Sequence, residues 1–280
     1  VFKWLQLISS SRYSGAWAVS VWLCDFVLTF AIIFKIPFTN IDWESYMVQV
    51  DAILAGNYDY SEISSPTGPI AYPAGFCWLY GGLRVLGLKT IHVQVMFGLL
   101  YLATLAVVLQ IYRKADVPGW LLAVCVLSKR VHSVFVLRLF NDSVAQFFMY
   151  AAMLLFFHGR HLLCSLVYSF AVSIKMQPVF FCPAIGLCLV LLGGWSHALA
   201  CIFFMLVLQV ALAAPFLKVN AAAYLARAFG GPGDLQLAWS VNWRFMPEAV
   251  FTSRFFGRAL LVVHFCLLAW FAQARWIPGG

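Results

Sequence analysis

Long apolar runs, separated by two polar stretches, set the pattern of this chain. A helix that crosses a bilayer needs about 20 mostly apolar residues, and the runs are long enough for about eight such helices. We expect them near residues 16–36, 92–112, 118–136, 143–158, 162–176, 178–194, 197–216 and 259–277. The polar stretches cover about 38–73 and 217–258.

Two features interrupt this pattern. The apolar segment 74–88 is too short to cross a bilayer, which favours a re-entrant or interfacial helix. The run 162–194 contains Lys175, Pro178 and Pro183. Because proline breaks helices and restricts the residue before it, we expect two short helices with a turn at Lys175–Pro178.

Composition places the chain among membrane proteins. Hydrophobic residues make up 64% of it and charged residues 10%, against roughly 25% charged in soluble domains. The unbroken apolar runs exclude a β-barrel, whose strands are short and alternate in polarity. We therefore predict an all-α polytopic membrane protein, and the absence of fixed repeats favours a single domain over residues 1–280. Nothing in the sequence indicates nucleic-acid binding.

Common catalytic and metal-binding patterns are missing from the sequence. It has no HExxH, P-loop or GxGxxG pattern, and its eight cysteines form no CxxC pair. His158 and His161 flank Arg160, which favours an interfacial basic cluster over a metal pair. Asp25 lies inside the first apolar run; we expect it to face a neighbouring helix and assign it no role.

The distribution of basic residues predicts the orientation only in part. Lys3 and Arg12 precede the first span, which favours a cytosolic N-terminus and puts both polar stretches on the far side. Several cations then lie on the far side against the positive-inside rule: Arg84, Lys89, Arg138, Lys175, Lys218, Arg227, Arg244, Arg254 and Arg258. Either the count of spans is off by one, or the far side keeps these cations for a reason. Phosphate-bearing substrates would be such a reason, since arginine and lysine bind phosphate.

Acidic residues are concentrated in the first polar stretch. Five of the ten lie between positions 42 and 62: Asp42, Glu44, Asp51, Asp59 and Glu62. Asp42 follows the first span directly, where a carboxylate is well placed to take a proton from a substrate in the bilayer. The alternative is a solvated loop that only connects two helices.

Four stretches carry a more specific signal. The first runs from Asn40-Ile-Asp-Trp-Glu-Ser-Tyr-Met to Gly56-Asn-Tyr-Asp-Tyr60 and Thr67-Gly-Pro-Ile-Ala-Tyr-Pro-Ala-Gly75. The others are Leu137-Arg-Leu-Phe-Asn-Asp-Ser143, Ser173-Ile-Lys-Met176 and Trp239-Ser-Val-Asn-Trp-Arg-Phe-Met-Pro-Glu248. Together, in order over nearly the whole chain, they resemble the dolichyl-phosphate-mannose-dependent α-1,3-mannosyltransferases of the endoplasmic reticulum.

The resemblance implies a GT-C-type helical bundle in which short lumenal helices carry the catalytic base. It implies a multi-pass protein of the endoplasmic reticulum membrane, with the active site facing the lumen and further membrane helices beyond residue 280. Asp42 matches the base, with Glu44 and then Asp51 as the alternatives. The implied reaction moves mannose, with inversion, from dolichyl phosphate mannose to the pentamannosyl dolichyl-pyrophosphate oligosaccharide. No cofactor is expected, because cations meet the phosphate charge and no Asp-x-Asp metal motif is present.

The resemblance also implies a set of substrate-binding residues. They are Glu44, Tyr46, Tyr72, Arg138, Asn141, Asp142, Lys175, Asn242, Arg244 and Glu248, with Arg138 and Arg244 expected to hold the donor phosphate from different segments.

Most of these residues also have a purely structural interpretation. Arg138 is placed to snorkel, Asn141 and Asp142 to cap a helix, and Arg244 and Glu248 to form a helical ion pair. The aromatic residues Tyr46, Tyr72, Trp239 and Trp243 would stack on sugars or form an interfacial belt.

Three other functions stay open at the level of the sequence. A related dolichyl-phosphate-sugar transferase would act on another acceptor. A transporter would also place charges between broken helices, although it would not need a large acidic loop with Gly-Pro turns. A structural subunit of a membrane complex is the third alternative.

Overall fold

Helices dominate the computed structural model, which describes residues 14–230 and 242–277. Within these ranges the strands are β1 (Ser64–Ser65) and β2 (Gly68–Pro69), which pair in antiparallel register. The chain divides into two compact units, Val1–Phe229 and Gly230–Gly280. The prediction of an all-α polytopic membrane protein is confirmed.

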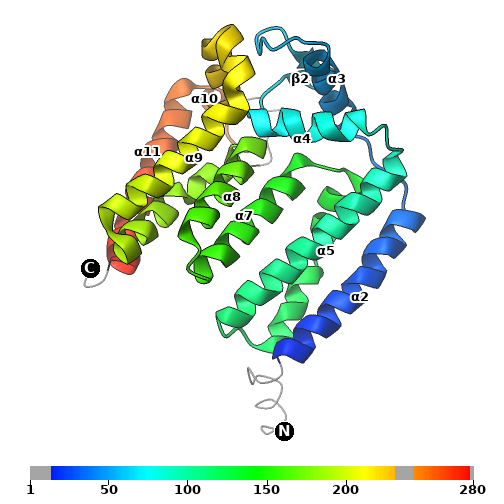
Figure 1. Ribbon diagram of the computed structural model, residues 1–280, viewed down its shortest axis with the longest axis vertical. Coiled ribbons are helices and arrows are strands. Elements are labelled where there is room, and N and C mark those ends of the chain that lie inside the picture. The colour runs from blue at the N-terminus through cyan, green and yellow to red at the C-terminus, as the bar shows by residue number, and fades with distance from the viewer. Residues whose placement is uncertain (1–13, 231–241, 278–280) are drawn as a thin grey trace, which may run out of the picture. The chain divides into compact units, whose positions relative to one another are not determined.

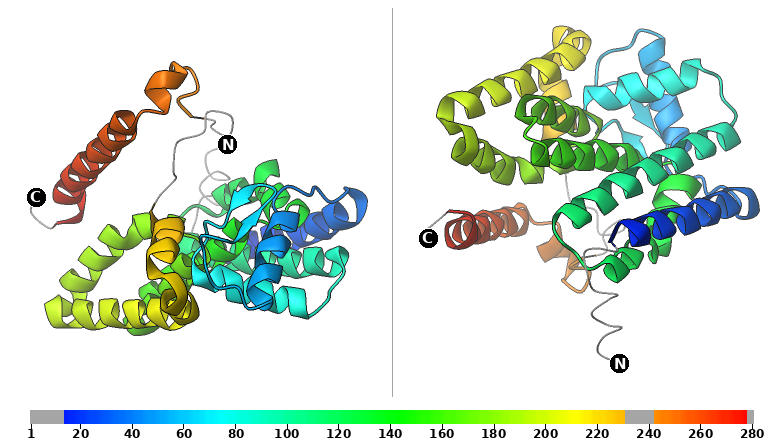
Figure 2. Two further views of the ribbon diagram at one scale, coloured as in Figure 1. Left: turned by 90° about the horizontal axis from the view of Figure 1, so that it is seen from above. Right: turned by 60° about the horizontal axis from the view of Figure 1, so that its bottom comes forward.

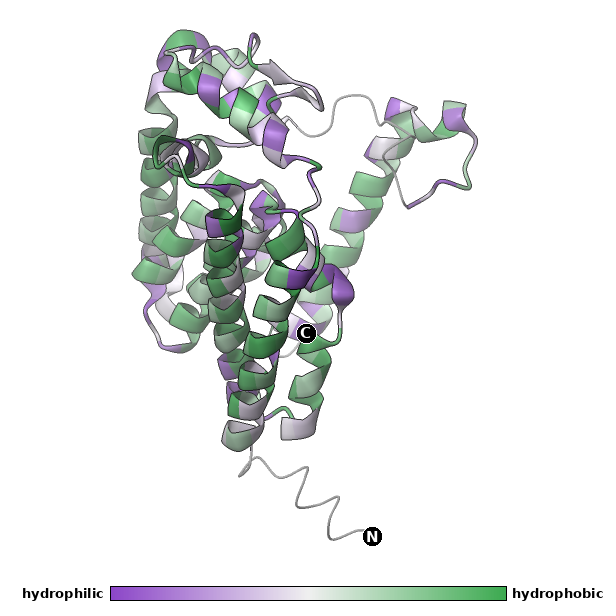
Figure 3. Cartoon of the chain, turned by 90° about the vertical axis from the view of Figure 1, so that its right-hand side faces the viewer, coloured by the Kyte–Doolittle hydropathy of each residue, from purple (hydrophilic) through white to green (hydrophobic). Residues whose placement is uncertain are grey.

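The first unit is a bundle whose long helices run side by side (Figure 1). Helix α5 (Thr90–Lys114) packs against α2 (Ser14–Lys35) and α7 (Asn141–Phe157), and α8 (His161–Ile174) packs between α7 and α9 (Cys182–Phe229). Apolar residues cover these helices on most sides (Figure 3). Because lipid replaces water around such helices, their exposed leucines and valines incur no hydration cost.

In the described part of the chain, four helical stretches are long and apolar enough to cross a membrane: Ser14–Lys35, Thr90–Lys114, Gln177–Phe229 and Arg254–Trp276. A fifth exists if the bent pair between Gly119 and Leu137 counts as one span. Helices α7 and α8 have only 17 and 14 residues. The number of spans therefore stays a prediction.

The predicted helix 118–136 is not a regular α-helix. It consists of the 3₁₀-helix η2 (Gly119–Val126), the short α6 (Lys129–His132) and the π-helix η3 (Ser133–Leu137), with a bend of 51°. Short π-helical turns occur frequently at functional sites. Here the π-turn ends immediately before Arg138.

The predicted break at Lys175–Pro178 is confirmed. Helix α8 ends at Ile174, Lys175 is extended (φ −149°, ψ 140°), and Pro178 lies in the 3₁₀-helix η4 (Gln177–Phe181). Helix α9 then bends at Gly194 (φ 75°), where a side chain would be strained, and again at Asn220.

The long helix is interrupted at Asn220 (φ −153°, ψ 82°), close to the predicted start of the polar stretch at residue 217, and a further helical segment follows as far as Phe229. The Asn220 side chain accepts a hydrogen bond from the Ala223 amide at 3.0 Å, and the alanine-rich sequence that follows favours a helix.

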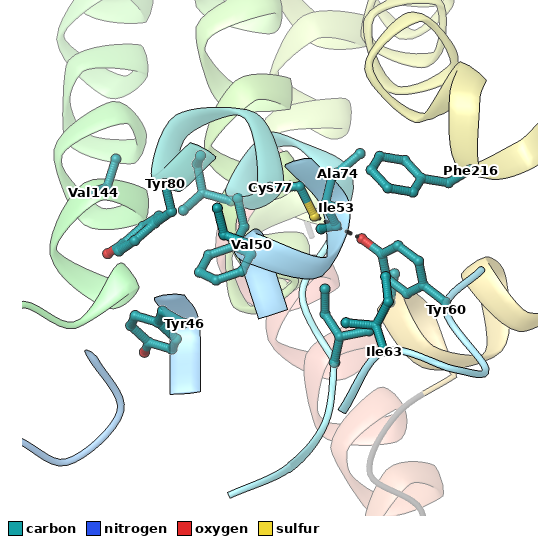
Figure 4. Packing of buried hydrophobic residues seen from close by; sticks show 14 of the residues in the cluster. Tyr46, Val50, Ile53, Tyr60, Ile63, Ala74, Cys77, Tyr80, Val144 and Phe216 are labelled. Atoms are coloured by element: carbon teal, nitrogen blue, oxygen red, sulfur yellow. Dashed lines mark hydrogen bonds between the residues drawn. The ribbon is translucent and has the colours of Figure 1, made fainter. Parts of the chain in front are cut away.

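A cap lies across one end of the bundle (Figures 1 and 2). We use the name for α3 (Trp43–Leu54), the β1–β2 hairpin and α4 (Ala74–Val85). Buried residues of α3 and α4 form one hydrophobic cluster, which includes Tyr46, Val50 and Tyr80 (Figure 4). Helix α4 has 12 residues, so the short helix predicted at 74–88 is confirmed and does not cross a bilayer by itself.

The second unit contains α10 (Glu248–Phe251), α11 (Arg254–Phe271) and the π-helix η6 (Ala272–Trp276). Ser253 caps α11 by accepting a hydrogen bond from the Phe256 amide at 3.2 Å. The helix predicted at 259–277 is therefore confirmed, and its cap explains why it begins earlier, at Arg254.

Candidate active site

Asp42 occupies the N-cap position of α3, but its carboxylate makes no capping hydrogen bond. The side chain is half-buried, and Oδ2 accepts a long hydrogen bond of 3.5 Å from the hydroxyl of Tyr46, one turn further along. Tyr46 is 2% exposed and packs edge-on against Tyr72 and Tyr80, with ring centroids 5.5 and 5.2 Å apart. The carboxylate thus keeps acceptor capacity that the helix does not use.

The second stretch approaches Asp42 through the turn after η3. The Thr39 amide donates to the carbonyl of Leu137 at 2.9 Å, and the Tyr80 hydroxyl donates to that of Leu139 at 3.3 Å. Leu139 has φ 53°, an unfavourable conformation for a residue with a side chain. The turn places Asn141 at the start of α7, where its Oδ1 lies 3.3 Å from the hydroxyl of Tyr46.

The third stretch contributes Lys175. Its ammonium group lies 2.6 Å from Oδ2 of Asp142 and 3.5 Å from Oδ1 of Asn141, and both Lys175 and Asp142 are about 30% exposed (29% and 28%). The approach depends on a close crossing of α4 and α8 at Gly75. A Cβ there would overlap the side chain of Ser173 and lie 2.9 Å from its backbone carbon. Only glycine fits this crossing.

The electrostatics of Asp42 reflect all three stretches. Burial raises the pKa of Asp42 above its ordinary value, while Lys175, the Tyr46 hydroxyl and Arg138 oppose the shift and Asp142 adds to it. A carboxylate with a raised pKa binds a proton more readily than an exposed one, as a general base must. Burial also raises the pKa of Tyr72 to about 12, so this residue keeps its proton at neutral pH.

Two nitrogen donors in the stretch that follows η3 have no hydrogen-bond partner within the described residues. They are Nε of Arg138 and Nδ2 of Asn141, and both are buried. Because buried donors are normally satisfied, they mark a place where a ligand oxygen would fit. We call Asp42, Arg138, Asn141, Asp142 and Lys175 the polar cluster.

The alternative bases lie elsewhere. Glu44 is exposed and exchanges hydrogen bonds with Asn40 at 3.2 and 3.3 Å. Asp51 is bound by Arg84 through two hydrogen bonds of 2.7 and 2.8 Å on the exposed face of α3. The hydrogen bonds of these two carboxylates thus go to Asn40 and Arg84, which are not members of the polar cluster.

Two structural interpretations were wrong. Asn141 and Asp142 do not cap α7, because the N-cap residue is Phe140 and no side-chain capping bond forms; they bind Tyr46 and Lys175 instead. Arg244 and Glu248 form no ion pair within residues 242–277, because Glu248 begins α10 whereas Arg244 lies in the preceding turn. Asn242, Arg244 and Glu248 are all exposed and belong to the second unit, and Trp239 lies outside the described residues.

The sequence analysis missed Tyr80, and it assigned no role to Gly75 and Ser173 although both lie in the stretches it singled out. Tyr72, Phe76 and Tyr80 recur every four residues, a spacing that places aromatic rings on one helical face. That spacing could have identified Tyr80 as a support for Tyr46. Within the described residues, no three or more His, Cys, Asp or Glu side chains are arranged to hold a metal ion.

The fold and the cluster define a polytopic membrane protein that gathers two carboxylates and two cations at one end of a helical bundle. The sequence model of the family described as ALG3 protein matches residues 19–279, and the chain belongs to this family.

Curated relatives agree with that assignment. The chain is 40% identical over 261 residues to the Dol-P-Man:Man(5)GlcNAc(2)-PP-Dol alpha-1,3-mannosyltransferase of Arabidopsis thaliana, covering 92% of this chain and 60% of the relative. It is 38% identical over 291 residues to the human protein of the same name, covering 99% and 66%. The chain thus spans 60–66% of the length of these relatives. No solved structure matches it.

Proposed function

We propose that the protein containing this chain transfers mannose from dolichyl phosphate mannose to a pentamannosyl dolichyl-pyrophosphate oligosaccharide, forming an α-1,3 linkage with inversion. Membership of the ALG3 protein family and the names of its relatives support this activity. The observation that carries it is the convergence of Asp42, Asn141, Asp142 and Lys175 from three separate stretches. We place the reaction at the lumenal face of the endoplasmic reticulum membrane.

Asp42 acts as the general base. Its carboxylate takes the proton from the acceptor hydroxyl, whose oxygen attacks the anomeric carbon of the donor mannose. The bond from that carbon to the phosphate oxygen breaks, and the electron pair leaves with dolichyl phosphate. One displacement converts the β-linked donor into an α-linked product, so a single base is sufficient and the phosphate needs no acid.

Arg138 and Lys175 bind the donor phosphate. Both cations lower the pKa of the Asp42 carboxyl group through their charges, which supports their assignment to the negative charge of the leaving group. The buried Nε of Arg138 supplies a donor for a phosphate oxygen, and charge-assisted bonds of this kind are stronger than neutral ones.

The remaining residues of the first unit hold the sugars. Tyr72, which is partly exposed, presents its ring and hydroxyl group, the buried Tyr46 supports it from below and binds Asp42, and the free amide of Asn141 donates to a sugar oxygen. Asp142 fixes the position of the Lys175 ammonium group. Glu44, Asn242, Arg244 and Glu248 stay predictions from the resemblance, each testable by substitution.

Cells that lack the protein provide the test of the acceptor. They should accumulate a lipid-linked oligosaccharide with five mannoses, and purified protein should extend it by one mannose from the dolichyl-phosphate donor. Accumulation of a different intermediate would assign the protein to another acceptor. No change in the lipid-linked oligosaccharides, together with no transfer in vitro, would contradict the enzyme function.

Transfer by the purified protein should not depend on a metal ion. The cations Arg138 and Lys175 meet the charge of a single phosphate, whereas metal-dependent transferases use carboxylate ligands for that purpose. We expect full activity after treatment with EDTA. A loss of activity that Mn²⁺ or Mg²⁺ restores would contradict this part of the proposal.

A further inference from the structure

A pair of ionisable side chains lies inside the helical bundle, apart from the polar cluster. Oδ1 of Asp25 in α2 lies 2.8 Å from Nε2 of His132 in α6, and the two side chains are 0% and 5% exposed. His132 also contacts the ring of Tyr101 in α5, with centroids 5.0 Å apart. Neither member of the pair contributes to the proposed reaction.

Stability alone gives a poor account of this pair. Removing two charged groups from water costs about as much free energy as their attraction returns, so buried pairs are weak evidence for stabilisation. Moreover, Oγ1 of Thr29 is buried without a partner within the described residues, and Oδ2 of Asp25 is buried with no group but the Tyr101 hydroxyl acting on its carboxylate besides His132. Ionisable groups among membrane helices usually serve a function. The position of His132 in the chain indicates which segment this pair holds.

His132 is the residue immediately before η3, the π-turn that ends at Arg138. Two further hydrogen bonds fix the same segment from other elements. Nε2 of Gln94 in α5 donates to the carbonyl of Val136 at 2.8 Å, and the Thr39 amide donates to that of Leu137 at 2.9 Å. Asp25 is therefore the anchor at the start of η3, while Gln94 and Thr39 hold its end.

We propose that Asp25 and His132 form a positioning pair that fixes η3, so that Arg138 and Asn141 are held beside Asp42 and Lys175. The pair itself touches no substrate. Its role rests on the proposed function, since Arg138 is assigned there to the donor phosphate. Loss of the pair lets η3 shift within the bundle and moves the Arg138 guanidinium away from the phosphate.

The test replaces both members together. The Asp25→Leu/His132→Leu variant leaves no uncompensated buried charge, so the bundle can fold. Hydrogen exchange of the purified protein should then rise roughly ten-fold or more in residues 133–141, because a charge-assisted bond no longer holds them. Residues 90–114 should keep their wild-type rates. The donor KM should rise, and the acceptor KM should stay unchanged.

Trp22→Phe is the matched control. Nε1 of Trp22, which lies one turn before Asp25 in α2, donates to the carbonyl of Leu102 in α5 at 2.9 Å. This substitution removes a bond that α2 makes to α5, and it leaves the bond from α2 to His132 in place. We expect wild-type exchange in 133–141 and a wild-type donor KM.

The outcomes separate the two proposals. Unchanged exchange in 133–141 of the folded double variant overturns the positioning pair. Increased exchange there, with no transfer by the wild-type protein, supports the positioning of η3 and overturns the proposed function. If the double variant does not fold, Asp25→Asn carries the test. It weakens the bond without removing it, so exchange in 133–141 should rise by a smaller factor, and unchanged exchange again overturns the proposal.

Discussion

The two ends of α3 carry carboxylates with opposite surroundings. In the C-terminal half of α3, the side chain of Asp51 is about half exposed and accepts two hydrogen bonds from the guanidinium group of Arg84. At its N-terminus, Asp42 is half-buried and accepts one long hydrogen bond from Tyr46, and desolvation raises the pKa of its carboxyl group. The sequence gives both residues the same side chain and places them in the same acidic stretch.

In the proposed mechanism, surroundings rather than residue type make the base. A carboxylate that is exposed and paired has its oxygens occupied by its partner. A desolvated carboxylate with free acceptor sites binds a proton more readily, and nearby cations limit the rise in its pKa. Asp42 meets this second description through Lys175 and Arg138, which come from distant parts of the chain.

The largest effect should follow from removing the base. Asp42→Asn should lower kcat by about a hundred- to ten-thousand-fold, the usual contribution of a general base, in a protein that still folds. Asp51→Asn is the matched control on the same helix and should leave kcat near the wild-type value. Turnover with purified donor and acceptor measures both. Near-normal turnover of the Asp42 variant, with loss in the Asp51 or a Glu44→Gln variant, would transfer the role of base to that residue.

A smaller effect should follow from removing a phosphate contact. Arg138→Ala should lower kcat/KM for the donor by about ten- to a hundred-fold, because a hydrogen bond to a charged group contributes about 1.5–3 kcal/mol. Arg138→Lys should recover only part of this loss, since lysine keeps the charge without the planar fork. Kinetics with donor and acceptor varied separately measure the effect. An increase confined to the acceptor KM would instead place Arg138 at the acceptor.

The crossing of α4 and α8 should matter for stability more than for chemistry. Gly75→Ala forces a methyl group against Ser173 and should destabilise the fold by about 1–3 kcal/mol, the usual cost of overpacking. Gly82→Ala is the control in the same helix, because a Cβ there meets no atom within 4 Å. Thermal unfolding in detergent compares them. Equal melting temperatures would show that the crossing is not tight.

Local patterns predicted most of the helices. Apolar length identified α2, α5 and α11, and a charge followed by prolines located the break at Lys175–Pro178, because these signals act on neighbouring residues. The same local reasoning was wrong for Asn141 and Asp142. Their position at a helix start favoured capping, but a tyrosine and a lysine from other helices bind them instead.

Contacts between stretches that are distant in the chain could not be predicted from the sequence. Asp42 was a candidate because it follows a span, yet its raised pKa depends on burial within the cap and on charges at positions 138, 142 and 175. The crossing at Gly75 depends on Ser173, and nothing in either local sequence indicates that the two residues meet. Resemblance to a family supplied the candidates, and tertiary packing brings those of the first unit together.

The pH dependence of donor kcat/KM tests most directly whether Asp42 is the base and whether Lys175 acts on it. Activity requires the ionised carboxylate, so it should fall as the pH drops through the raised pKa of Asp42, at a higher pH than for an ordinary aspartate. Because Lys175 lowers that pKa, Lys175→Met should move the acidic limb to still higher pH, whereas Arg84→Met should leave it unchanged. An acidic limb at the same pH in wild type and Lys175→Met would contradict the account.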